Sequence, residues 1–355
     1  MKRMFQFGIV IAMLLGMIGF AMPAYASTPQ HYTVLVGAEN TGTGVSIMDY
    51  FPHTVKLHVG DSITWKINSH EIHTVTFLAD QALEDFVIPA PQGMISPLQI
   101  NSNAIFPAAP ANGLYDGSTF VNSGIMSQDS GFVKTFTLTF TQQGQFAYVC
   151  YVHGQLMSGE VDVVGANVAI PNPGQVTARG RAELAADLQR VPGVLQAAKA
   201  QIVPDIKNPD GTLTHTITLG YMAGDIMVMK FFPSHVTVHP GDTILWQLSD
   251  MQDAPHTVTF FNGAPDLPLV TIVQGQSGPV ALINPAIVFP SQAVMQGEPL
   301  NGTDFFSSGL LVPGSPNTSF SLKVGNITGK LNYECILHDS SGMSASLIIV
   351  PQNGD

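Results

Sequence analysis

Four side chains with soft donor atoms have a spacing that suits a metal site. Cys150, His153 and Met157 form the pattern C-x-x-H-x-x-x-M directly after an apolar run that predicts a strand. His73 lies far upstream, at the start of a second predicted strand, His-Thr-Val-Thr-Phe. One thiolate, two imidazoles and one thioether make up the trigonal His₂Cys environment with a weak axial Met that suits a blue-copper centre. The pattern therefore predicts one copper ion held by these four residues.

The same donor set occurs a second time. Cys335, His338 and Met343 follow as C-x-x-H-x-x-x-x-M, with one more residue before the methionine, and His256 begins another His-Thr-Val-Thr-Phe. A second copper centre is therefore predicted. Because the two ligand loops differ in length, the two centres need not have equal potentials.

An internal repeat accounts for the doubled set. Residues 51–61 return as residues 232–242, and Trp65 returns as Trp246 at the same offset. Within each copy apolar and polar residues alternate, as in residues 55–59 of the first, and no helical pattern is interleaved. This favours an all-β fold of two tandem antiparallel Greek-key β-sandwiches. The expected domains are residues 27–165 and 208–355.

The connector, residues 166–207, has a different pattern. Leu184, Leu188 and Val191 have helical spacing, and Pro192 is expected to break or kink the run. The connector has five basic and three acidic residues, whereas each flanking domain has three basic and eleven acidic residues. We expect a partly helical connector docked across two acidic domains, and a partner-binding segment is the alternative.

The first 26 residues have the features of an export signal. Lys2 and Arg3 precede an apolar run that ends in Ala24-Tyr25-Ala26, a pattern typical of signal-peptidase sites. Cleavage there predicts a periplasmic or extracellular protein with no membrane span, and a retained anchor helix is the alternative.

Both halves resemble the cupredoxins, the family of plastocyanin, amicyanin and azurin. The resemblance rests on the following segments and on their equivalents in the second copy: Gly60-Asp61, Trp65, His73-Thr74-Val75, Tyr148-Val149-Cys150, His153 and Met157-Ser158-Gly159. It covers nearly all of both domains but not the connector. Each copy departs from the simplest members by having more than seventy residues between its upstream histidine and its cysteine.

The resemblance implies one type 1 copper per domain, which changes between Cu(I) and Cu(II) and carries single electrons between redox partners. It also implies that His153 and His338 lie nearest the surface and form the electron port, ringed by Val152, Leu156 and Leu337. Thirteen basic residues against 25 acidic ones exclude a nucleic-acid footprint. The acidity of each domain predicts a redox partner with a basic docking face.

Several alternatives remain at this stage. Copper storage or delivery is one, although such proteins favour open, exchangeable sites. A copper oxidase or a nitrite reductase-like enzyme is another, although neither cysteine has a neighbouring histidine and the chain has no His-x-His pair. Cys150 and Cys335 could pair as a disulfide, His70 could replace His73 as a ligand, and the two methionines could be plain core residues.

Overall fold

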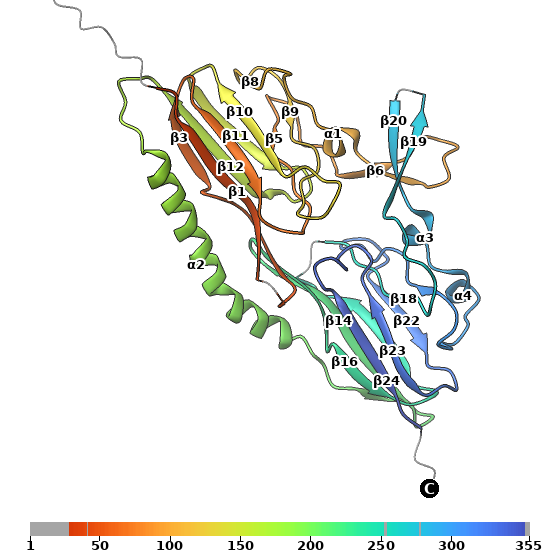
Figure 1. Cartoon of the computed structure of the whole chain (residues 1–355). Coiled ribbons are helices and arrows are strands. Elements are labelled where there is room, and N and C mark those ends of the chain that lie inside the picture. The colour runs from red at the N-terminus through yellow and green to blue at the C-terminus, as the bar shows by residue number, and fades with distance from the viewer. Residues whose placement is uncertain (1–27, 41, 252–253, 277, 352–355) are drawn as a thin grey trace, which may run out of the picture.

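The computed structural model describes residues 28–40, 42–251, 254–276 and 278–351, and the expected export signal lies outside them. Two β-sandwiches follow one another along the chain, and one long helix lies beside both of them (Figure 1). The predicted all-β fold with two tandem sandwiches and a helical connector is confirmed.

The first sandwich consists of two sheet layers. One layer has the order β2 (Val45–Phe51), β1 (His31–Asn40), β4 (Ser62–Ile67), β10 (Thr135–Phe140) and β8 (Leu114–Tyr115). The other has the order β3 (Thr54–His58), β12 (Gly154–Val164), β11 (Gly144–Cys150), β5 (Thr76–Phe77) and β9 (Val121–Asn122). The sandwich is not purely antiparallel, because the chain crosses between layers after β2 and returns as β4 parallel to β1.

The second sandwich repeats this plan. One layer has the order β15 (Ile226–Phe232), β14 (Leu213–Ala223), β17 (Thr243–Leu248) and β22 (Ser319–Lys323). The other has the order β16 (His235–Val238), β24 (Ser344–Ile349), β23 (Gly329–Glu334), β18 (Thr259–Phe260) and β21 (Phe306–Ser307). β13 (Ile206–Lys207) pairs with β14, so the last two residues of the expected connector belong to the sheet of the second sandwich.

The alternating residues fill a core between the layers of each sandwich. Trp65 is fully buried, and its ring lies edge-on to Phe77 and Tyr148. Trp246 has the equivalent position in the second core, against Phe260 and Tyr333. Each large apolar side chain removed from water in this way contributes about 1.5–3 kcal/mol. The packed cores give the loops at the sandwich ends a rigid base.

Helix α2 (Pro173–Lys199) begins with a complete capping box, in which the side chain of Asn172 accepts from the backbone of Gln175 and that of Gln175 accepts from Asn172. Of the expected break or kink at Pro192, the break does not occur, because one helix continues through this residue. Val191 and Val194, on either side of it, are buried against both sandwiches, and this packing opposes the cost of the proline.

The sheets of the two sandwiches also join directly. β2 and β15 pair antiparallel, with Ile47 opposite Ile226, so that one ten-stranded sheet runs through both domains. The last turns of α2 cover this junction, where Phe51 and Phe232 belong to the same buried cluster as Val191. Among the described residues, no helix is long and apolar enough to span a membrane.

The long insertions between the upstream histidines and the cysteines meet in a second junction. They contain β6 (Val87–Pro89), β7 (Leu98–Ile100) and α1 (Ser102–Ile105) in the first copy, and β19 (Val270–Gly275), β20 (Gly278–Ile283), α3 (Pro285–Val288) and α4 (Gln292–Met295) in the second. β20 pairs with β7, which makes a four-stranded sheet from both copies (Figure 1). Pairing on two sides, together with α2, fixes the domains relative to each other.

Candidate metal centres

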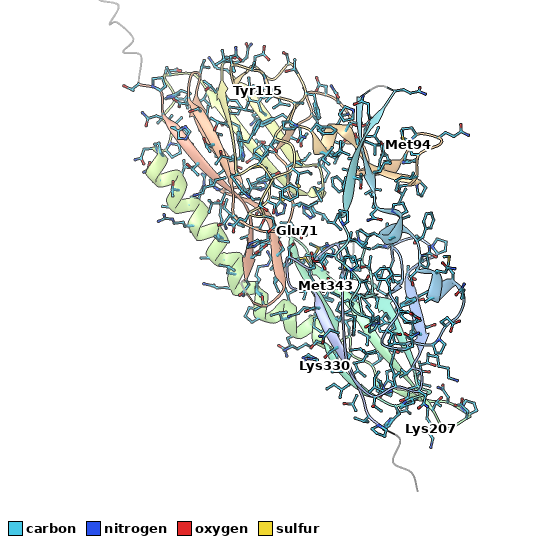
Figure 2. All side chains as sticks on the ribbon, turned by 45° about the vertical axis from the view of Figure 1, so that its right-hand side comes forward. Glu71, Met94, Tyr115, Lys207, Lys330 and Met343 are labelled. Atoms are coloured by element: carbon cyan, nitrogen blue, oxygen red, sulfur yellow. The ribbon has the colours of Figure 1, made fainter. Side chains whose placement is uncertain are left out.

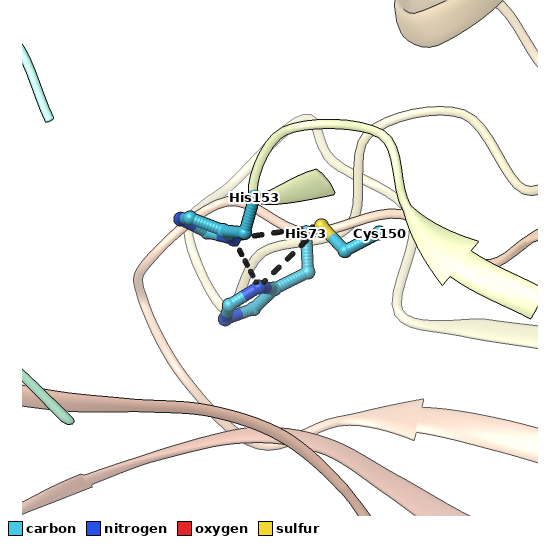
Figure 3. Close-up of side chains that lie close together, drawn as sticks. All are labelled: His73, Cys150 and His153. Carbon is cyan, nitrogen blue, oxygen red and sulfur yellow. Dashed lines mark hydrogen bonds between the residues drawn. The ribbon is translucent and has the colours of Figure 1, made fainter. Parts of the chain in front are cut away.

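The first donor set comes together at one end of the first sandwich. Cys150 ends β11, His153 follows in the turn to β12, and His73 stands just before β5. The Sγ atom of Cys150 lies 3.5 Å from Nδ1 of His153 and 3.9 Å from Nδ1 of His73, and the two Nδ1 atoms are 3.2 Å apart (Figure 3). Met157, on the adjacent β12, is fully buried.

The second donor set has the same arrangement. Sγ of Cys335 lies 3.4 Å from Nδ1 of His338 and 3.6 Å from Nδ1 of His256. The ligand loop is closed by backbone hydrogen bonds: the N–H of Cys335 donates to the carbonyl of Met343, and the N–H of Met343 donates to that of His338. Met343 is fully buried. In each group, one sulfur and two nitrogen atoms lie within 4.8 Å of one another.

The protonation chemistry of these groups fits a bound cation. Burial lowers the pKa of His153 to about 3 and that of His338 to about 4, so both imidazoles are neutral and offer lone pairs. Burial also raises the pKa of the Cys150 and Cys335 thiols to about 11. A buried thiolate with two neutral imidazoles facing it therefore needs a positive charge among them, which a soft metal ion supplies.

Backbone donors hold each sulfur in place. The N–H of Thr74 donates to Sγ of Cys150 at 3.3 Å, and the N–H of Tyr151 donates to Oγ1 of Thr74 at 2.7 Å. The second site repeats both contacts, from Thr257 to Cys335 at 3.3 Å and from Ile336 to Thr257 at 2.9 Å. In each site, hydrogen bonds thus connect the segment after the upstream histidine to the cysteine without a bound metal.

Two serine hydroxyls, which the sequence analysis did not single out, also hold the strands that follow the upstream histidines. The hydroxyl of Ser123 accepts a hydrogen bond from the N–H of Val75 at 2.8 Å, and Ser308 does the same for Val258 at 2.9 Å. The recurrence of Asn122-Ser123-Gly124 as Ser307-Ser308-Gly309 was the available signal.

Gly37 leaves room for His73 in the first site because it has no side chain. It lies in a bulge of β1 with φ of +64°, and a Cβ atom there would lie 2.4 Å from Nε2 of His73. Gly220 has φ of +67° in the equivalent bulge of β14. A glycine inside an alternating strand, present in both copies, was the signal that could have identified this close approach.

The structure decides between the alternative ligands. His70 does not join the donor group, since its Nδ1 lies 3.0 Å from a carboxylate oxygen of Glu39. Cys150 and Cys335 are both free, so the disulfide alternative is wrong. A third group of donors, Asp49, Asp187 and Asp225, is partly buried and includes a residue of α2, Asp187. Arg190 forms ion pairs with Asp187 and Asp225, which accounts for that cluster without a metal.

The loop histidines are the more exposed imidazoles of their donor groups, as the resemblance implies, but neither is open to solvent. His338 is 6% exposed and the side chain of His153 is 10% exposed, whereas His256 and His73 are fully buried. Residues of the expected apolar ring differ in exposure, since Leu156 is 46% exposed whereas Val152 and Leu337 pack against the core. The exposure of both loop histidines is small because other parts of the same chain cover these ends of the sandwiches. The sequence pattern of a single domain does not reveal this cover.

Comparison with known proteins gives structural similarities only. No protein-family model matches the chain, and none of the curated proteins matches it in sequence. An oxidised variant of amicyanin is 19% identical, with 40% of this chain and 89% of amicyanin covered and a TM-score of 0.22. Oxidised plastocyanin from Dryopteris crassirhizoma is 20% identical, with 38% of this chain and 99% of that chain covered and a TM-score of 0.22.

The donor groups and the strand order agree in both halves. Each sandwich places a cysteine at the end of one strand, a histidine three residues later, an upstream histidine before the neighbouring strand and a buried methionine nearby. This is the donor set of a type 1 copper centre. Each of the two β-sandwich domains thus contains the donor set of one type 1 copper site, built from His, Cys, His and Met.

Proposed function

We propose that the protein is an exported electron carrier, which accepts and donates single electrons through its two copper centres. The observation that supports this most directly is the doubled, buried His, Cys, His and Met group. Bound copper supplies a one-electron change between Cu(I) and Cu(II).

The chain's own residues favour electron transfer over substrate chemistry. His73, Cys150 and Met157 are each fully buried, as are His256, Cys335 and Met343. The enclosing side chains exclude water, and the hydrogen bonds from Thr74 and Thr257 hold both sulfur atoms. Donors that are fixed in this way need little rearrangement when the charge at the site changes by one.

The partner and the location belong to the same proposal. The acidic surface of each domain supports a redox partner with a basic docking face, whose association should slow as salt screens the charges. The N-terminal signal pattern supports a periplasmic or extracellular location.

The test is the copper content and visible spectrum of residues 27–355. We expect two coppers per chain and an intense thiolate-to-copper band, with Cys150→Ser and Cys335→Ser each removing one copper and part of the band. Reversible one-electron titration of each remaining site would support the carrier function. Copper that a mild chelator removes rapidly would favour storage, and additional copper without the thiolate band would favour an enzyme.

A further inference from the structure

The ligand loops of the two copper sites lie at the junction between the domains. His153 and His338 are the loop histidines of the two sites, and both are almost completely covered. In Figure 2, Glu71 beside the first site and Met343 of the second are both labelled at the centre of the molecule, where the two sandwiches meet. Glu71 lies 3.8 Å from Nε2 of His153 through its Oε1 atom.

A small open pocket is lined by residues of both domains. Its volume is about 170 Å³, and its lining includes Glu39 and His70 from the first domain and Ser340 and Ser341 from the second. Ser340 and Ser341 belong to the loop between His338 and Met343, whereas His70 is three residues before His73. The second site's ligand loop and the segment that precedes the first site's upstream histidine therefore face each other.

We propose that the two centres form an electron-exchanging pair, with the imidazoles of His153 and His338 as the path across the domain junction. This rests on the proposed function, since it needs copper at both sites. One electron leaves the reduced centre and arrives at the oxidised one, and no proton or bond moves with it. The pairing of β2 with β15, the pairing of β7 with β20 and helix α2 keep the path at fixed length.

The first test is electron paramagnetic resonance of the fully oxidised, copper-loaded chain. The control is an equal mixture of Cys150→Ser and Cys335→Ser proteins, which holds both kinds of centre at the same concentration but on separate molecules. We expect dipolar broadening in the two-copper chain that is lost in the mixture. Superimposable spectra of the full chain and the mixture would overturn the proposed electron-exchanging pair. A missing type 1 signal in either variant would instead count against the proposed function of the site that the variant retains.

The second test is electron exchange itself. After addition of less than one equivalent of reductant, the electron should redistribute within the full chain at a rate that does not change on dilution. In the mixture of variants, exchange needs collision, so its rate should fall in proportion to concentration. A dilution-dependent rate in the full chain would overturn the proposal while leaving two functional copper sites in place.

A third test needs no copper. In the metal-free full chain, a histidine-modifying reagent should label His53, whose side chain is 52% exposed, and should leave His153 and His338 unmodified. Labelling of all three at similar rates would show that the loop histidines face solvent, and would contradict the junction between the two sites.

Discussion

Replacing Gly37 by Ala should disturb the first copper site and leave the second intact. Gly37 has φ of +64°, a region that costs an L-residue about 1–2 kcal/mol. The added methyl group would also lie 2.4 Å from Nε2 and 2.8 Å from Cδ2 of His73, and 2.7 Å from Oγ of Ser69. Either His73 or strand β1 must therefore shift.

The two costs can be separated with a matched variant. Gly60 also has a left-handed backbone, with φ of +93°, but no atom lies within 4 Å of a Cβ placed there. Gly60→Ala therefore reports the backbone cost of about 1–2 kcal/mol alone. The contact with His73 adds a further overpacking cost, typically about 1–3 kcal/mol, and moves a copper ligand.

Two measurements complete this test. Denaturant unfolding of the metal-free variants gives the free-energy difference, and copper titration with the visible spectrum gives the state of each site. We expect Gly37→Ala to be less stable than Gly60→Ala and to lose or shift the contribution of the first site to the thiolate band. Equal stability and identical spectra would refute the steric role assigned to Gly37.

Three further changes test other parts of the structure. Burial, followed by the charge of Glu39, raises the pKa of Glu71 from 4.5 to about 8. The folded state thus favours the neutral acid. The metal-free protein should therefore lose of the order of a few kcal/mol of stability as the pH rises from about 4.5 to 8. Unfolding free energies across this range should show the loss, and Glu71→Gln should largely remove it. Met157→Leu should keep copper bound but raise the potential of the first site, and an unchanged potential in a redox titration would show that Met157 is not axial. Asn172→Ala should cost about 1 kcal/mol in denaturant unfolding by removing the cap of α2, whereas an unchanged midpoint would show that the cap adds nothing.

The ligand residues could be predicted because three of the four in each site are separated by short, fixed spacings in the sequence. Cys150 and His153 are three residues apart on one tight turn, so local geometry brings them together. The repeat then identified His73 over His70, since only His73 has a counterpart in the second copy. Alternation of apolar residues likewise indicated the strands on which these ligands stand.

The junction between the domains could not be predicted in the same way, because it depends on pairs of strands far apart in sequence. β2 and β15 did carry a signal, since both are apolar along nearly their whole length, a pattern typical of strands covered on both faces. The continuous helix through Pro192 depends on the same junction, because the packing that opposes the proline's cost comes from both domains.

The two copies differ close to ligands that they share. The hydroxyl of Tyr50 donates to the carbonyl of Thr74 at 2.5 Å beside the first site, whereas Phe231 stands at the equivalent position in the second copy and has no hydroxyl. Glu71, next to His153, has Ala254 as its counterpart. Since a type 1 potential responds to hydrogen bonds and charge around the ligands, identical donor sets in these unequal surroundings should have different potentials. Duplication thus conserved the means of holding copper, and the residues beside the ligands determine which site an electron favours.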